Sequence, residues 1–160
     1  MTTLTAKMGS FPVLETLAAS IQFSWRDAGR VTLEPSGKIS VLALPEIAGL
    51  YRFTLTPSPG QTRRRVYIGE TDNLRRRLAG YRNPGPSQRT NLRLNGLLVE
   101  HLTSAGIVLF AVAVEVAVTL DSDDQWQSVN LARRAGRLLA ENAALVLAHV
   151  TDDADIENLG

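Results

Sequence analysis

The chain of 160 residues contains no cysteine and few aromatic residues. Without cysteine it has no disulfide bonds and no thiolate metal sites, which agrees with the reducing cytoplasm where we expect the protein. Lysine is also scarce: it occurs twice, so the cationic side chains are almost all arginine. Hydrophobic residues make up 44% of the chain and charged residues 21%, as in an ordinary globular protein.

The chain also lacks a convincing secretory signal or membrane span. Its most apolar stretch, 102–120, reads LTSAGIVLFAVAVEVAVTL and is almost long enough to cross a bilayer. However, Glu115 lies within it, basic flanks are absent, and valine and alternation dominate after Val112. We therefore expect a buried strand and no membrane association.

The net charge of +1 conceals a strong segregation of charge along the chain. From Arg63 to Arg93 there are nine arginines against two acids, whereas from Glu115 onward there are nine acids against three arginines. A basic middle and an acidic tail predict a localised anion-binding face. The alternative is a solvated helix surface with no binding role.

The length favours a single domain. We expect a disordered leader at 1–10 and an N-terminal elaboration at 11–47, with a short helix within 11–25 and a hairpin within 30–44. The core is expected at 48–158, and 11–160 then form one domain.

Within that core the pattern predicts an α+β fold in the order β-β-α-α-β-α. A strand beginning near Ala48 and a second at 63–69 form a hairpin. A helix capped by Thr71 or Asp72 runs to Tyr81, and another covers 88–105 and ends at Gly106. A third strand at 107–120 precedes a long helix from 122–124 to His149. We expect a small mixed three-stranded sheet flanked by helices.

Two tripeptides on the paired strands carry the strongest functional signal. Gly49-Leu50-Tyr51 and Tyr67-Ile68-Gly69 each combine a tyrosine with a glycine that permits close approach. The next helix presents Arg77 and Tyr81 on one face, four residues apart.

This arrangement resembles the GIY-YIG nuclease family in a compact stand-alone or restriction-type form. The resemblance covers about two thirds of the chain. Asn73-Leu74 matches the step before the family's catalytic arginine, which corresponds to Arg77. The family's metal-binding glutamate matches Glu141 best, with Glu115 as the rival, and its late asparagine matches Asn158. The sequence departs from the pattern at Glu70, where many members carry lysine.

The resemblance implies a DNA endonuclease that hydrolyses phosphodiester bonds. Glu141 would bind one Mg²⁺ or Mn²⁺ ion, and Arg77 would hold the phosphate. Tyr51 would be the general base, with Tyr67 and Tyr81 in support, although the sequence leaves open which tyrosine is the base. Nearby cations are expected to lower the tyrosine pKa values.

Further residues are expected to support the site or bind nucleic acid. The support residues are Gly49, Gly69, Asn73 and Asn158. The arginines expected to contact DNA phosphates are Arg63, Arg64, Arg65, Arg76, Arg82, Arg89 and Arg93. Because each chain has one apparent site, a homodimer is one way to cut both strands. The alternatives are a nucleic-acid-binding module of the same fold without turnover, and a protein-interaction or inhibitor domain.

Overall fold

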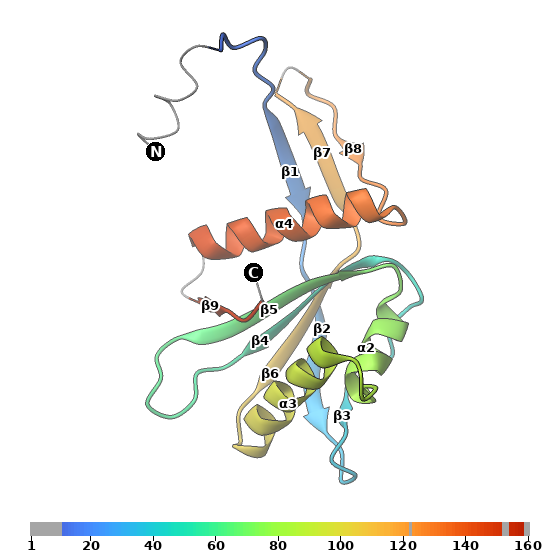
Figure 1. Cartoon of the computed structure of the whole chain (residues 1–160), viewed down its shortest axis with the longest axis vertical. Helices are drawn as coiled ribbons and strands as arrows, with labels where there is room; N and C mark the ends of the chain where they lie inside the picture. Colours follow the sequence, from blue (N-terminus) through green and yellow to red (C-terminus); the bar gives the residue numbers. More distant parts are fainter. Residues whose placement is uncertain (1–10, 122, 152–153, 159–160) are drawn as a thin grey trace.

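The computed structural model describes residues 11–121, 123–151 and 154–158, and it combines two β-sheets with helices (Figure 1). The predicted leader at 1–10 lies outside the described residues. None of the described helices is both long and apolar enough to cross a bilayer.

Three strands form the centre of the larger sheet, and all three were predicted. They are β4 (Gly49–Leu55), β5 (Arg64–Thr71) and β6 (Val108–Ala113). β4 lies between the other two in antiparallel register, so that Tyr51 is opposite Gly69 on one side and Val112 on the other. This register brings the two tripeptides side by side.

The prediction of a three-stranded sheet is wrong in size, because the sheet has six strands in the order β3-β2-β6-β4-β5-β9. β2 (Arg26–Leu33) and β3 (Ile39–Ser40) are the predicted N-terminal hairpin, and β2 pairs with β6. β9 (Ala154–Ile156) pairs in parallel with β5. These additions cover edges that a bare three-stranded sheet leaves unpaired.

The second sheet overturns two further predictions. It contains β1 (Ala19–Phe23), β7 (Val116–Leu120) and β8 (Gln127–Ser128), in the order β1-β7-β8. Residues 19–23 therefore form a strand rather than part of a helix. The predicted strand at 107–120 is two strands, because the chain leaves the first sheet after Ala113 and enters the second at Val116.

The helices cover both faces of the six-stranded sheet. α2 (Leu74–Arg82) and α3 (Arg89–Thr103) pack on one face, and α4 (Arg134–Thr151) lies across the other (Figure 1). Alternation along β4 supplies both cores: Tyr51 and Phe53 face α2 and α3, whereas Leu50 faces α4.

The boundaries of two helices differ from the prediction. Asn73, rather than Thr71 or Asp72, caps α2, because its side chain accepts a hydrogen bond from the Arg76 amide at 2.9 Å. α4 begins about ten residues later than predicted, since β8 and a turn at Asn130 occupy the intervening chain. A Cβ at Gly136 would overlap the Asn130 carbonyl oxygen, so the glycine allows this turn to pack on the helix.

Candidate active site

Three tyrosines from three elements form a buried cluster between α2 and the sheet. Tyr51 lies on β4, Tyr67 on β5 and Tyr81 on α2. The hydroxyl oxygens of Tyr51 and Tyr81 are 2.5 Å apart, and the rings of Tyr51 and Tyr67 stack with centroids 6.3 Å apart. The structure thus brings together all three tyrosines singled out in the sequence.

Gly69 makes room for this cluster. A Cβ at position 69 would overlap the hydroxyl and ring of Tyr51, which lies directly opposite on β4. Gly49 is also closely surrounded, although less so than Gly69: a Cβ at position 49 would lie 3.0 Å from the Ala113 carbonyl oxygen. Gly69 in the second tripeptide therefore leaves the space that the Tyr51 side chain occupies.

The acidity of the tyrosines differs from the expectation. Burial raises the pKa of Tyr51 well above its ordinary value; Tyr81 and Tyr67 add to this, and the Arg77 guanidinium lowers it by a smaller amount. Burial likewise raises the pKa of Tyr81. The predicted lowering of the Tyr51 pKa by nearby cations is therefore wrong for the protein alone, because desolvation outweighs Arg77.

Arg77 is half-buried on α2 beside these phenols. Burial opposes its charge, while Tyr51, Tyr81 and Tyr67 favour it electrostatically, as does Glu70, so that the net shift of the Arg77 pKa is upward. Arg77 also lines an open cleft of about 550 Å³ that runs along α2 to the start of α3, together with Asp72, Arg76 and Asn91. Its guanidinium is a fixed positive charge at a cleft accessible to solvent.

Glu141 lies on α4 and is half-buried at the edge of β5. Burial raises its pKa, the nearby Glu70 carboxylate raises it further, and the Glu70 backbone amide and Arg77 lower it. Arg77 is the smallest of these influences on Glu141, which extends from the opposite face of the sheet. The rival Glu115 lies between β6 and β7, has a side chain 80% exposed and pairs with Arg26.

Sequence reasoning missed an ion pair that joins β5 to α4. The Arg137 Nε donates to the Glu70 carboxylate, and these side chains are only 11% and 18% exposed. Arg137 also donates to the carbonyl oxygens of Leu131 and Ala132, at 3.1 and 3.0 Å. The i,i+4 spacing of Arg137 and Glu141 places Arg137 on the same face of the helix as the candidate metal ligand, but it carries no signal for the pairing with Glu70.

Asn158 bonds to the outer edge of β5 where the pairing with β9 ends. Its side-chain oxygen accepts from the Ile68 amide at 2.9 Å, and its side-chain nitrogen donates to the Ile68 carbonyl oxygen. The asparagine thus continues the pairing that β9 makes with residues 64–66. Past Ile68 along β5, Glu70 bonds to Arg137 on α4.

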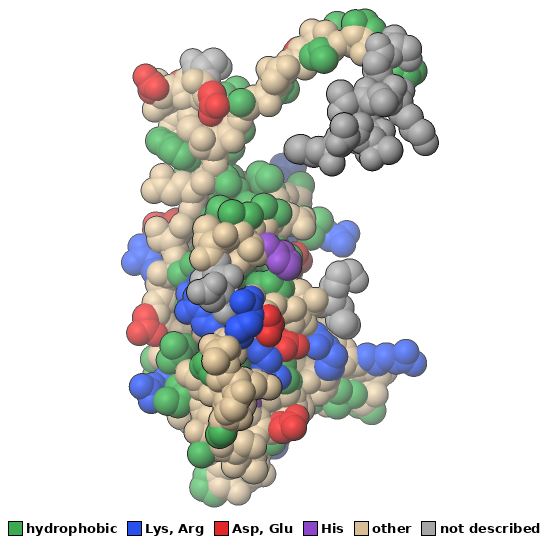
Figure 2. Space-filling view, turned by 90° about the vertical axis from the view of Figure 1, so that its left-hand side faces the viewer, with side chains coloured by type: hydrophobic (Ala, Val, Ile, Leu, Met, Phe, Trp, Pro, Cys, Tyr) green, Lys and Arg blue, Asp and Glu red, His purple; other side chains and the backbone are tan. Residues whose placement is uncertain are grey.

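Most of the arginines expected to bind DNA are paired within the protein. Arg63 bonds to Asp155 at 2.9 Å, Arg65 lies 3.8 Å from Glu157, and Arg93 donates to the Glu157 carbonyl oxygen. Arg76 pairs with Asp72. Figure 2 shows basic and acidic side chains interspersed on one face of the molecule. The charge segregation of the sequence is therefore partly neutralised in space.

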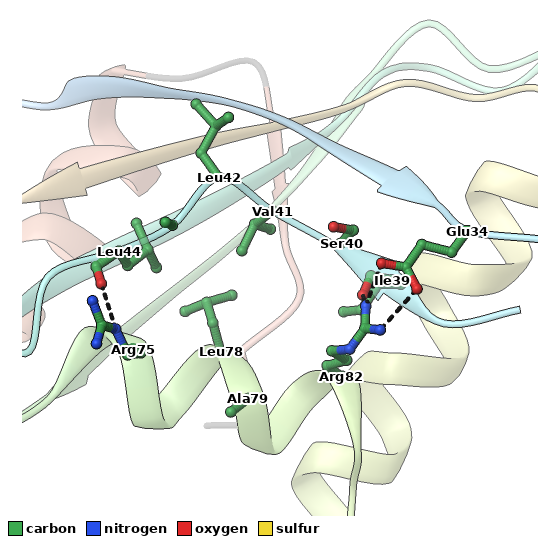
Figure 3. Close-up of a pocket in the computed structure, with 11 residues that line it drawn as sticks. Glu34, Ile39, Ser40, Val41, Leu42, Leu44, Arg75, Leu78, Ala79 and Arg82 are labelled. Carbon is green, nitrogen blue, oxygen red and sulfur yellow. Dashed lines mark hydrogen bonds and ion pairs between the residues drawn. The ribbon is translucent and has the colours of Figure 1, made fainter. Parts of the chain in front are cut away.

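Arg82 points to a different pocket, away from the tyrosines. It donates to Glu34 at 2.7 Å and to the Ile39 carbonyl oxygen, at one end of an apolar hollow of about 300 Å³ (Figure 3). Leu78 projects into the middle of this hollow, and Arg75 bonds to the Leu44 carbonyl oxygen at its other end. This pocket holds α2 against the N-terminal hairpin.

The fit of the site to a divalent cation depends on Glu141. Among the described residues there is no group of three or more His, Cys, Asp or Glu side chains that could hold a metal ion. Magnesium commonly keeps several waters and binds through one or two carboxylates plus substrate phosphates. A single half-buried carboxylate, on which the Arg77 charge also acts, fits that coordination.

Comparison with known proteins identifies a similar fold among solved structures. The sequence matches no protein-family profile and no curated protein. Among solved structures, the chain is similar to a mutant of bacteriophage T4 EndoII, with a TM-score of 0.50 and 17% sequence identity. The match covers 84% of this chain and 92% of the EndoII chain. At this identity the likeness is one of fold.

Proposed function

We propose that this chain is a metal-dependent endonuclease of the GIY-YIG type that hydrolyses phosphodiester bonds in DNA. The observation that carries the proposal is the buried cluster of Tyr51, Tyr67 and Tyr81 with the half-buried Arg77 beside it. Glu141 comes from α4 on the opposite face of the sheet, and Arg77 is one of the charges that act on it. The likeness of fold to EndoII, whose name denotes an endonuclease, supports it.

Arg77 is assigned to the scissile phosphate. Its guanidinium can donate two parallel hydrogen bonds to phosphate oxygens, and it lines the open cleft beside α2. Partial burial strengthens its electrostatic effect on the negative charge that develops at phosphorus. Because the tyrosines hold α2 against β4, Arg77 needs little reorganisation to act.

Glu141 is assigned to a divalent cation, Mg²⁺ or Mn²⁺. When bound, such an ion supplies Lewis-acid polarisation of the phosphate and stabilises the leaving oxygen. Glu141 suits this role because hard cations prefer carboxylate oxygens, and because Arg137 already neutralises the adjacent Glu70. Among the described residues, the site therefore offers the cation one carboxylate that forms no ion pair.

Tyr51 is assigned to the attacking water, with Tyr81 as its hydrogen-bonded partner. Since burial raises the pKa values of both phenols, they are neutral at pH 7 and orient the water as hydroxyl groups. Removal of the water's proton by Tyr51 then becomes more effective as the pH rises. Tyr67 stacks on Tyr51 and restricts its ring.

DNA would approach over the cleft that contains Arg77. Arg76 lines the same cleft, and Arg89 lies exposed at the start of the following helix. Arginines that contact phosphates make DNA affinity fall as salt concentration rises. Arg63 and Arg65 near β9 contribute less, because they do not line this cleft and are paired with Asp155 and Glu157.

The test is cleavage of supercoiled plasmid and of single-stranded DNA with Mg²⁺ or Mn²⁺. The variants are Arg77→Ala and Glu141→Gln, and Arg76→Ala is a matched control on the same helix. We expect Arg77→Ala to lose roughly 10²–10³-fold in rate, as when one transition-state donor is removed. Arg76→Ala should retain turnover with weaker DNA binding.

Three results would contradict the proposal in different ways. Retention of DNA by all proteins without cleavage under any metal would favour the non-cleaving binding module. No retention even at low salt would favour a protein-interaction domain. Equal rates for Arg77→Ala and Arg76→Ala would remove Arg77 from the chemistry.

A further inference from the structure

The N-terminal arm, residues 11–18, is apolar yet exposed. Phe11, Val13, Leu14 and Leu17 are 68%, 81%, 97% and 77% exposed. The arm leaves β1 at the end of the molecule far from the six-stranded sheet (Figure 1). Only isolated apolar residues are usual on a surface, so four within seven positions indicate an interaction segment.

The outer face of α4 is a second exposed apolar surface. It is formed by Leu139, Val146, Leu147 and Val150, which are 50%, 62%, 44% and 78% exposed. Positions 139, 143, 146 and 150 follow the alternating four-three spacing of a helix that packs against a partner, with Ala143 completing the row. No Lys, Arg, Asp or Glu occurs from 142 to the end of the helix at 151.

A hollow adjoins the outer face of α4. It has a volume of about 490 Å³, and its lining includes Ile21 and Phe23 of β1, Trp25 with Arg52 over its ring, and Leu147 and Ala148 of α4. Since Leu147 belongs to both surfaces, the hollow and the helix face are continuous. An aromatic or leucine side chain inserted there would form the kind of buried anchor that dominates interface energetics.

We propose that two copies of this chain form a dimer by exchanging N-terminal arms. The arm of each copy lies along the outer face of α4 in the other copy and places Phe11 or Leu14 in the hollow. The exchange is reciprocal, which gives a closed twofold assembly in which the same contact occurs twice.

The dimensions suit this contact. Eight residues of extended arm span about 26 Å, and the helix row from Leu139 to Val150 spans about 16 Å. The arm therefore covers the row with residues to spare. The two surfaces also match in chemistry, because Glu15 is the only charged residue in the arm.

The direction of the arm favours the other copy. β1 contacts α4 through its C-terminal half, Ile21–Phe23, whereas the arm departs from the opposite end, where the Ala18 carbonyl accepts from Asp121 at the far end of β7. An arm folding onto its own α4 would first retrace about 16 Å of strand. A stable interface buries roughly 800 Å² per partner, and a reciprocal exchange contributes the contact of one arm with one helix twice.

The absence of cysteine allows a direct test, because single-cysteine variants report one contact each. Leu14→Cys and Val146→Cys are mixed, allowed to exchange and oxidised gently. We expect a disulfide-linked species of twice the chain mass from the mixture and far less from either variant alone. A Leu92→Cys variant, exposed on α3, replaces Val146→Cys as the control.

Analytical ultracentrifugation of the full chain gives the second readout. We expect a dimer for the wild type and for Leu92→Glu, and a monomer for Val146→Glu and for Leu14→Asp. A monomeric wild type would overturn the proposal. So would a double variant Leu14→Cys/Val146→Cys that links only within one chain, because the arm would then cover its own helix. These readouts do not depend on nuclease activity.

Discussion

At the scale of single residues, Gly69 packs so closely on Tyr51 that a Cβ at position 69 would overlap the Tyr51 hydroxyl and ring. Gly69→Ala puts a methyl group where the Tyr51 hydroxyl lies, so we expect a loss of about 1–3 kcal/mol in the free energy of unfolding, measured by urea denaturation. Gly96→Ala is the control: no atom lies within 4 Å of a Cβ there, and alanine favours the helix by about 0.5–1 kcal/mol. Equal effects at both positions would contradict the packing described for Tyr51.

The raised pKa of Tyr51 predicts an alkaline rate profile. With Tyr51 neutral at pH 7, the fraction of phenolate grows about tenfold per pH unit, so kcat/KM should rise with near-unit slope from pH 7 to 9. Tyr51→Phe should lose on the order of 10²-fold and flatten the profile. A wild-type profile that is flat over this range would show that Tyr51 does not remove the proton.

Glu141 makes a prediction about stability. Its folded pKa is raised by burial and by Glu70, so its favourable contribution is complete below the unfolded value of about 4.3 and is lost as the pH rises through the folded pKa. At pH 7 the ionised carboxylate therefore destabilises the fold. We expect Glu141→Gln to raise the melting temperature at pH 7, on the order of 2 °C, and to have no such effect at pH 4.

Added Mn²⁺ separates this electrostatic effect from metal binding. The ion should raise the melting temperature of the wild type and leave Glu141→Gln unchanged, because a ligand stabilises only the state that binds it. Equal Mn²⁺ shifts in both proteins would place the cation elsewhere.

At the scale of elements, the Arg137–Glu70 pair joins α4 to β5. Arg137→Gln or Glu70→Gln alone leaves a largely buried charge without its partner, at a cost of about 3–5 kcal/mol. The double variant should cost less than the sum, with a coupling of about 1–3 kcal/mol measured by urea denaturation. The exposed Arg76–Asp72 pair on α2 is the matched control, expected to couple by only about 0.3–0.5 kcal/mol. Equal coupling in the two pairs would argue against a structural link at Glu70.

Local signals predicted the elements that surround the site. The hairpin of β4 and β5, α2 and α3 follow from alternation, helical periodicity and stop signals within one segment each. The errors concern pairings between distant segments. Residues 19–23 are strand because β7 pairs with them, and β9 joins the sheet because β5 offers an edge. No short window of sequence carries that information.

The same distinction applies to the candidate site. Tyr51, Tyr67 and Tyr81 were identified from spacing, and the structure brings them together. Arg137 was missed because its partner Glu70 lies 67 residues earlier. The pKa of Tyr51 was misjudged because charges are visible in a sequence, whereas the burial that outweighs them is not.

At the scale of the whole molecule, charges that are segregated in the sequence meet in space. The acidic C-terminal segment pairs with the basic middle through Arg63 and Asp155 and through Arg65 and Glu157. This pairing fixes β9 on β5 and confines the candidate DNA surface to the cleft beside α2. Arg77 takes no part in this pairing; it is half-buried beside the tyrosine cluster, and its charge also acts on Glu141.

The most direct test of the central claim is anomalous diffraction at the manganese edge from crystals of the protein with a short DNA duplex. The account predicts one manganese peak at the Glu141 carboxylate, with a DNA phosphate between the metal and the Arg77 guanidinium and the Tyr51 hydroxyl on the same side. A manganese peak at other carboxylates, or a phosphate that contacts neither Arg77 nor the metal, would contradict it.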